Sequence, residues 1–150
     1  SQPEAAIKTL EELCSRRNDW QPLITAYEKR AETQRDSQRR ISALRARLEH
    51  QLLDLPGVRI NGNTKHRLYN TANICFSGVK STDLIPKINH RICVSSGSAC
   101  TSSLAHPSHV LKAMGLSDED SYSSIRFSLG KHNTEEEIDE TIALIKKALS

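Results

Sequence analysis

A helical stripe of apolar residues that stops at a Pro-Gly pair constrains the fold of this chain most. Apolar side chains recur three or four positions apart before Pro56-Gly57, at Ile41, Leu44, Leu48, Leu52 and Leu55. Such spacing buries one face of a helix, and Pro and Gly both end helices. We therefore predict a helical stretch over 22–55, preceded by a shorter helix over 4–15. The charged and polar segment 29–40 is either the exposed surface of one long helix or a break between two.

The pattern changes after residue 57, where short apolar runs alternate with turn residues. We predict strands at 58–60, 73–76, 91–94 and 124–129. Helices are predicted at 81–89 with Ser81 as the N-cap, at 107–114, and from Thr134, which has the capping-box spacing to Glu137. The predicted fold is α+β, a small mixed or antiparallel sheet covered by helices and preceded by a helical N-terminal segment.

The composition is that of a soluble globular protein. Of the 150 residues, 37% are hydrophobic, 26% are charged and 4% are aromatic. No apolar run approaches the roughly 18–20 residues that cross a bilayer, and the first residues carry no secretory signal. The four cysteines include no C-x-x-C pair, so we expect reduced thiols and a cytoplasmic location. The composition therefore predicts neither a membrane protein nor a secreted one.

One stretch lacks any large apolar side chain and surrounds a cysteine. It comprises Ser95, Ser96, Gly97, Ser98, Ala99, Cys100, Thr101, Ser102 and Ser103. Small hydroxylated residues favour an exposed, mobile loop, in which a thiol is accessible and can react. The alternative is a linker in which Cys100 is incidental. Cys75 and Cys93, by contrast, lie between apolar neighbours in predicted strands, and we expect both to be buried in the core.

Arg126 is the second candidate site residue. It alternates with Ile125 and Phe127 in the last predicted strand. Alternation places its guanidinium on the face opposite those apolar neighbours, where its planar fork suits a carboxylate. The alternative is an ordinary exposed arginine on a strand.

Two other patterns suggest different ligands. Zinc-binding residue types occur at Cys93, Cys100, His106 and His109, but their spacing matches no standard zinc finger, so we predict no metal site. Basic residues outnumber acidic ones between 29 and 50, which suits phosphate or an acidic protein partner. With a net charge of +3 and few aromatic residues, nucleic acid is not the expected ligand.

Several motifs in order along the chain resemble one enzyme family. The loop 95–102 is similar to the active-site loop of pyridoxal-phosphate-dependent cysteine desulfurases of the NifS/IscS type, in the aminotransferase class V family. Four more segments resemble the family's central small-domain strand, the helix after the loop, the substrate-arginine strand and the last helix: 70–76, 107–116, 123–130 and 134–139. The resemblance implies the small domain of fold-type I pyridoxal-phosphate enzymes over 41–150, preceded by a helical segment without an assigned role over 1–40.

The resemblance also implies a reaction and assigns residues to it. In this family L-cysteine binds pyridoxal phosphate, a loop thiolate removes its sulfur as a persulfide, and alanine is released. By position, Cys100 is the nucleophile and persulfide carrier, and Arg126 holds the substrate carboxylate. Ser95 to Ser103 form the mobile loop that carries sulfur to an acceptor, in iron–sulfur cluster assembly or in tRNA or cofactor thiolation. The family is homodimeric.

The chain departs from the family at the cofactor lysine. That lysine follows a histidine in the family, whereas Lys65-His66 and Lys131-His132 have the reverse order. We therefore expect no cofactor-binding residue in this chain, no activity of the chain alone, and a complementing pyridoxal-phosphate-binding domain or chain as its partner. The alternative is a stand-alone persulfide carrier or regulatory binding module without pyridoxal chemistry.

Overall fold

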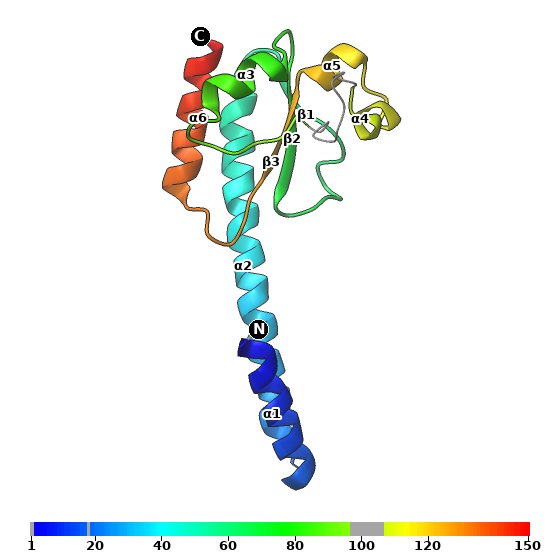
Figure 1. Ribbon diagram of the computed structural model, residues 1–150, viewed down its shortest axis with the longest axis vertical. Helices are drawn as coiled ribbons and strands as arrows, with labels where there is room; N and C mark the ends of the chain where they lie inside the picture. Colours follow the sequence, from blue (N-terminus) through cyan, green and yellow to red (C-terminus); the bar gives the residue numbers. More distant parts are fainter. Residues whose placement is uncertain (1, 18, 97–106) are drawn as a thin grey trace. The chain divides into compact units, whose positions relative to one another are not determined.

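The computed structural model describes residues 2–17, 19–96 and 107–150 (Figure 1). Its helices and strands follow in the order α1 Gln2–Arg17, α2 Gln21–Leu53, β1 Val58–Ile60, β2 Thr71–Phe76, α3 Ser81–Ile88, α4 His109–Ala113, α5 Asp118–Tyr122, β3 Ser124–Ser128 and α6 Glu135–Leu149. The chain divides into two compact units, Ser1–Arg39 and Arg40–Ser150, and α2 contributes residues to both.

The first unit consists of α1 and the first part of α2. Cys14 of α1 and Leu23 of α2 are buried there, and the Tyr27 hydroxyl donates a hydrogen bond of 3.0 Å to Glu11 Oε1. The segment 29–40 is helical throughout and largely exposed. Its charged residues therefore form the surface of one long helix, which settles the choice that the sequence left open.

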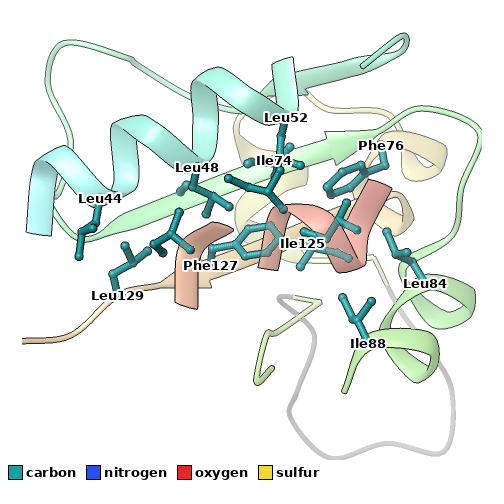
Figure 2. Packing of buried hydrophobic residues seen from close by; sticks show 14 of the residues in the cluster. Leu44, Leu48, Leu52, Ile74, Phe76, Leu84, Ile88, Ile125, Phe127 and Leu129 are labelled. Atoms are coloured by element: carbon teal, nitrogen blue, oxygen red, sulfur yellow. The ribbon is translucent and has the colours of Figure 1, made fainter. Parts of the chain in front are cut away.

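The second unit is built on a three-stranded antiparallel sheet in the order β1-β2-β3. One face of the sheet packs with α2, α3 and α6 around a hydrophobic core (Figure 2). Leu48 and Leu52 of α2, Ile74 of β2 and Ile125 of β3 are almost fully buried in it. Burial of each such side chain stabilises the fold by about 1.5–3 kcal/mol. The predicted α+β fold, with a small antiparallel sheet covered by helices, is confirmed.

Several local predictions are confirmed in this unit. β1 spans the predicted 58–60, and the capping box of α6 is present, with reciprocal bonds of 3.3 Å and 3.2 Å between Thr134 and Glu137. Cys75 is fully buried, as expected. The turn after α2 places Gly57 at a φ of 73°, a left-handed conformation that glycine adopts without strain.

The prediction of a strand at 91–94 is wrong, and so is the prediction that Cys93 is buried. This segment forms no regular strand, and Cys93 is exposed. Ile92 and Val94 pack against the core, so the side chain between them is turned away from it. The segment meets β3 at an isolated bridge between Ser95 and Arg126 rather than along a ladder.

Two helix starts and one short helix also differ from expectation. The N-cap of α3 is Lys80, without a side-chain cap, and Ser81 is buried inside the first turn. Helix α4 begins after Ser108, whose hydroxyl accepts a hydrogen bond from the Leu111 amide. Helix α5 was not predicted, because its sequence has no apolar periodicity. It is held by the cap at Ser117 and by acidic residues in its first turn.

Two kinds of site are absent from the part of the chain that the structure describes. None of its helices combines the length and the apolar character that a membrane span requires. No cluster of three or more His, Cys, Asp or Glu side chains within these ranges could hold a metal ion. Of the four residues considered for zinc, Cys100 and His106 lie outside the described residues.

Candidate functional site

The sheet face opposite the core is polar and carries the candidate site. Alternation along the strands gives this face Asn73 and Cys75 of β2, together with Ser124 and Arg126 of β3. Helix α5 packs against β2, and in Figure 1 α4 and α5 lie on the side of the sheet away from α2 and α6. The polar face therefore lies next to the segment that leads into the loop 95–103.

The structure brings two of the predicted site residues together through their backbones. The Arg126 amide donates a hydrogen bond of 2.7 Å to the Ser95 carbonyl, and the Ser95 amide donates one of 3.1 Å to the Arg126 carbonyl. The start of the loop is thus anchored beside Arg126. Ser96 is half-buried. The remaining predicted loop residues lie outside the described residues: Gly97, Ser98, Ala99, Cys100, Thr101, Ser102 and Ser103.

The side chain of Arg126 differs from the other arginines of the second unit. Arg40 donates hydrogen bonds to the carbonyl oxygens of Lys131 and Asn133. Five more arginines each pair with an Asp or Glu carboxylate: Arg45, Arg47, Arg59, Arg67 and Arg91. Among the residues that the structure describes, none pairs with the exposed Arg126 guanidinium. A guanidinium fork without an acidic partner is available to an external carboxylate.

Cys75, on the same face, is a buried thiol inside a polar network. Its Sγ lies 3.7 Å from the Asp120 carbonyl oxygen. The side chain of Asp120 in turn forms an ion pair with Arg59, with 2.6 Å between Oδ1 and the guanidinium nitrogen. Burial raises the pKa of the Cys75 thiol, while the nearby Arg59 charge acts in the opposite direction. The hydrogen bond from Arg59 holds the pKa of Asp120 below its usual value. Because Cys75 is fully buried and a raised pKa disfavours its thiolate, it has the surroundings of a structural thiol on the polar face of the sheet.

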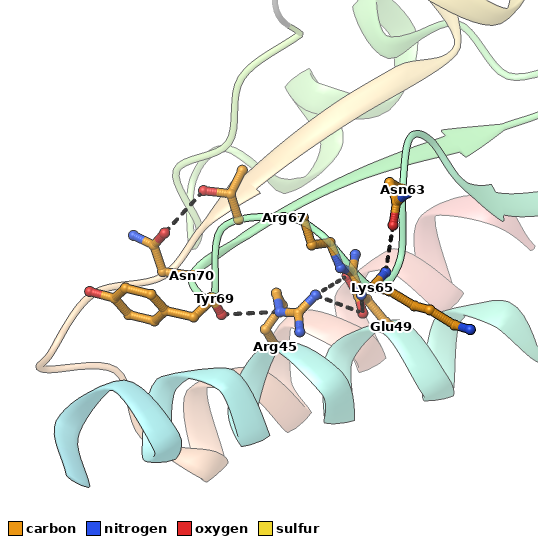
Figure 3. Close-up of polar contacts among 8 residues, drawn as sticks. Arg45, Glu49, Asn63, Lys65, Arg67, Tyr69 and Asn70 are labelled. Atoms are coloured by element: carbon orange, nitrogen blue, oxygen red, sulfur yellow. Dashed lines mark hydrogen bonds and ion pairs between the residues drawn. The ribbon is translucent and has the colours of Figure 1, made fainter. Parts of the chain in front are cut away.

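A buried carboxylate that sequence reasoning missed fixes the segment leading into β2 (Figure 3). Glu49 of α2 is 5% exposed and accepts two hydrogen bonds of 2.6 Å from Arg67. Arg45, one helical turn before Glu49, reaches the same carboxylate at 3.4 Å and donates to the Tyr69 carbonyl at 3.0 Å. The i, i+4 spacing of Arg45 and Glu49 was the available signal. This cluster holds 67–69 on α2 and so positions β2.

A cavity of about 620 Å³ lies between α2, α6, β3 and the segment 90–94. Leu48, Phe127 and Ile138 line its apolar part, and the exposed Cys93 is among its other lining residues. Pyridoxal phosphate requires a lysine for its Schiff base. None of the described residues that line this cavity is a lysine, so these residues do not fit the cofactor.

The chain is similar to known cysteine desulfurases. The family model described as aminotransferase class-V matches residues 25–141. Cysteine desulfurase IscS of Pasteurella multocida is 50% identical over 111 residues, which covers 74% of this chain and 27% of that protein. IscS of an Escherichia coli O139:H28 strain is 44% identical over 124 residues, covering 83% and 30%. The X-ray structure of a NifS-like protein from Rickettsia africae matches with a TM-score of 0.67 at 33% identity, covering 85% of this chain and 33% of that one.

These matches cover most of this chain but only a part of each relative. The chain spans less than a third of the length of the IscS proteins it matches. The family model itself covers well over half of the chain and includes most of α2, the sheet and the start of α6. The names of these relatives agree with the resemblance drawn from the motifs. The chain therefore belongs to the aminotransferase class-V family and is a NifS/IscS-type member of it.

Proposed function

We propose that this chain is the sulfur-carrying, small-domain part of a cysteine desulfurase. Residues 41–150 form the small domain, and 1–40 form a helical extension without an assigned role. Cys100 takes sulfur from L-cysteine as a persulfide and passes it to an acceptor, in iron–sulfur cluster assembly or in tRNA or cofactor thiolation. The names of the relatives support the reaction class. The observation in this structure that carries the proposal is the guanidinium of Arg126, which pairs with none of the described residues and lies on the strand that anchors the start of the loop.

Arg126 has the surroundings of a carboxylate ligand. Its backbone is fixed on both sides, by β2 through the sheet and by Ser95 through the bridge. Its side chain is exposed, so a substrate carboxylate can reach it. A bidentate pair between guanidinium and carboxylate fixes orientation as well as position. Arg126 therefore orients the amino acid whose sulfur is to be removed.

The short stretch of chain between Ser95 and Cys100 supports the assignment of Cys100 and Arg126 to one site. Cys100 follows Ser95 by five positions in the sequence, and an extended chain spans at most about 3.6 Å per residue. The Cys100 backbone thus stays within about 18 Å of the Ser95 anchor, a range from which the loop can deliver the thiol to a substrate held by Arg126. The small hydroxylated residues around Cys100 favour accessibility of the thiol.

The chemical step at Cys100 is a transfer of sulfur between two thiols. The Cys100 thiolate forms a bond to the substrate sulfur, and the substrate carbon–sulfur bond breaks with its electron pair on carbon. Protonation of that carbon gives alanine, and Cys100 keeps the persulfide. Pyridoxal phosphate, held by the complementing part of the enzyme, would supply the electron sink that this cleavage requires. We propose that the cofactor lysine belongs to that part and that this chain alone is inactive.

A stand-alone persulfide carrier or regulatory binding module is the second candidate. In this candidate the chain handles sulfur without holding the cofactor. Such a chain would accept sulfur from an already loaded enzyme. It would not need a free substrate carboxylate, so replacement of Arg126 would leave its sulfur loading unchanged.

Persulfide mapping tests the proposal. The chain is combined with a pyridoxal-phosphate-bearing large domain of an IscS relative and with L-cysteine, and intact peptides are analysed by mass spectrometry. We expect one additional sulfur atom on Cys100, no label in Cys100→Ser, and full label in Cys93→Ser, the matched exposed-thiol control. Arg126→Ala should reduce capture of L-cysteine by about tenfold or more, the value of a hydrogen-bonded charge. Sulfur on Cys75 or Cys93 in place of Cys100 would contradict the assignment.

A further inference from the structure

We propose that Asn73 of β2 is a second ligand of the carboxylate held by Arg126, and that Asn61 is the residue that positions it. The inference rests on the proposed function and extends its substrate site from one side chain to two. It is drawn from the register of β2 and β3 and from a chain of hydrogen bonds across the polar sheet face.

The register places Asn73 and Arg126 directly opposite each other. The Phe76 amide donates a hydrogen bond to the Ser123 carbonyl, and the Leu129 amide donates one to the Asn70 carbonyl. These bonds identify the hydrogen-bonded pairs of the two antiparallel strands, which recur at every second residue. Asn73 and Arg126 fall between such pairs, so they form a non-hydrogen-bonded pair. In such pairs the two Cα atoms are about 4.5 Å apart and the side chains lie on the same face, close together.

A relay of hydrogen bonds fixes which end of the Asn73 amide is free. The Ser124 hydroxyl lies 2.6 Å from the Asp120 carbonyl, which can only accept, so the hydroxyl donates its proton there. Ser124 Oγ must then accept from the Asn61 amide nitrogen, 2.8 Å away. The same nitrogen lies 2.6 Å from the Asn73 side chain, which therefore presents its oxygen to Asn61.

The outcome of the relay is an Asn73 amide nitrogen with two free protons. No hydrogen bond from this nitrogen occurs within the described residues, as is also true of the Arg126 guanidinium. Two adjacent donors without an acceptor, one charged and one neutral, suit the two oxygens of a carboxylate. Asn73 is half-buried, so its donor is pre-oriented at lower entropic cost than an exposed chain. The substrate class is thus an amino acid bound through its α-carboxylate.

Side-chain NMR of the full chain with acetate as the probe tests this site without the cofactor. The ¹⁵N-labelled protein is titrated with acetate against chloride at constant ionic strength. We expect the Asn73 side-chain amide signals and the Arg126 Nε signal to move together with one dissociation constant. Asn73→Asp should abolish acetate binding, because its free oxygen would pair with Arg126.

The control for Asn73→Asp is Asn63→Asp, which adds the same charge. Asn63 Oδ1 only accepts, from the Lys65 and His66 amides at 2.8 Å, and aspartate keeps both bonds. We expect wild-type acetate affinity in this control. Asn61→Leu, neutral and of similar shape, should weaken acetate binding severalfold and increase the fast motion of the Asn73 side-chain amide, as ¹⁵N relaxation would show, because nothing then holds its oxygen. A merely structural role of Asn61 would leave the relaxation of the Asn73 amide unchanged.

The outcomes separate this inference from the proposed function. If Arg126 responds to acetate while the Asn73 signals stay fixed, or if Asn73→Asp binds acetate as the wild type does, Asn73 is not a ligand and the role of Arg126 stands. If neither residue responds, the carboxylate site itself is refuted and the proposed role of Arg126 falls with it.

Discussion

Replacement of Glu49 by glutamine should strongly destabilise the second unit. Glu49 is a buried carboxylate on α2 whose two oxygens each accept a 2.6 Å hydrogen bond from Arg67. An amide of the same shape removes the negative charge and turns one acceptor into a donor that faces Arg67. Two guanidinium groups, Arg45 and Arg67, would then share a partly buried position with no anion between them.

The expected magnitude follows from the burial of the three side chains. Removal of one partner from a buried ion pair costs about 3–5 kcal/mol. The side chains of Arg45 and Arg67 are 11% and 18% exposed, so water reaches both in part, and we expect the lower end, about 3 kcal/mol. Among the described residues, the Nε of Arg67 is already buried without a hydrogen-bond partner, so loss of the carboxylate leaves more of this guanidinium unpaired. For a chain of this size the melting temperature would fall by about 6–12 °C.

Urea unfolding followed by far-ultraviolet circular dichroism measures this loss, with NMR amide signals of β2 as a reporter of the second unit. Trp20 lies in the first unit, so its fluorescence does not report the change. The control is Asp139→Asn, which breaks a bidentate pair with Arg47 of 2.7 Å and 2.8 Å on the exposed surface. We expect the control to unfold like the wild type. A loss below about 1 kcal/mol in Glu49→Gln, or equal losses in both variants, would refute the reasoning.

Three further predictions concern single residues. Thr134→Ala removes the α6 capping box and should cost about 1 kcal/mol in urea unfolding, whereas Thr134→Ser should restore the stability; an undiminished Thr134→Ala variant would contradict the role of the cap. Iodoacetamide should alkylate Cys93 and spare Cys75 in the native protein, as peptide mapping would show, because Cys75 is buried and burial raises its thiol pKa; rapid native alkylation of Cys75 would count against this. Because the folded-state pKa of Asp120 is lowered from 3.8, its pair with Arg59 stabilises the fold above that value and is lost as the pH falls through the lower one. Asp120→Asn should therefore flatten the acid side of the stability–pH curve, and an unchanged slope would exclude this contribution.

The parts of the fold that the sequence predicts are those with a strong local period. The stripe from Ile41 to Leu52 marks the buried face of α2, and the Thr134 capping box marks the start of α6. The alternation around Arg126 places it correctly on the exposed face of β3. In each case the local pattern and the tertiary packing favour the same structure, so the pattern alone is enough to predict it.

The prediction failed at residues whose state depends on contacts distant in sequence. Cys93 has apolar neighbours on both sides, as Cys75 does, yet Cys75 lies in the central strand and Cys93 lies beyond the edge of β3. Glu49 lies on α2 between apolar positions, and its burial depends on Arg67, 18 residues later. Composition and spacing do not encode which strand is central or which arginine reaches back to a helix.

The same distinction applies to the candidate site. Arg126 could be identified from the sequence because it alternates with the apolar Ile125 and Phe127, which is a local signal. Asn73 gives no such signal, since an asparagine inside a strand reads only as a weak strand former. Its part in the site depends on being opposite Arg126 and on the relay through Asn61 and Ser124. A polar residue in the central strand is oriented from both neighbouring sides, and this position favours the proposed role of Asn73 as the second carboxylate donor.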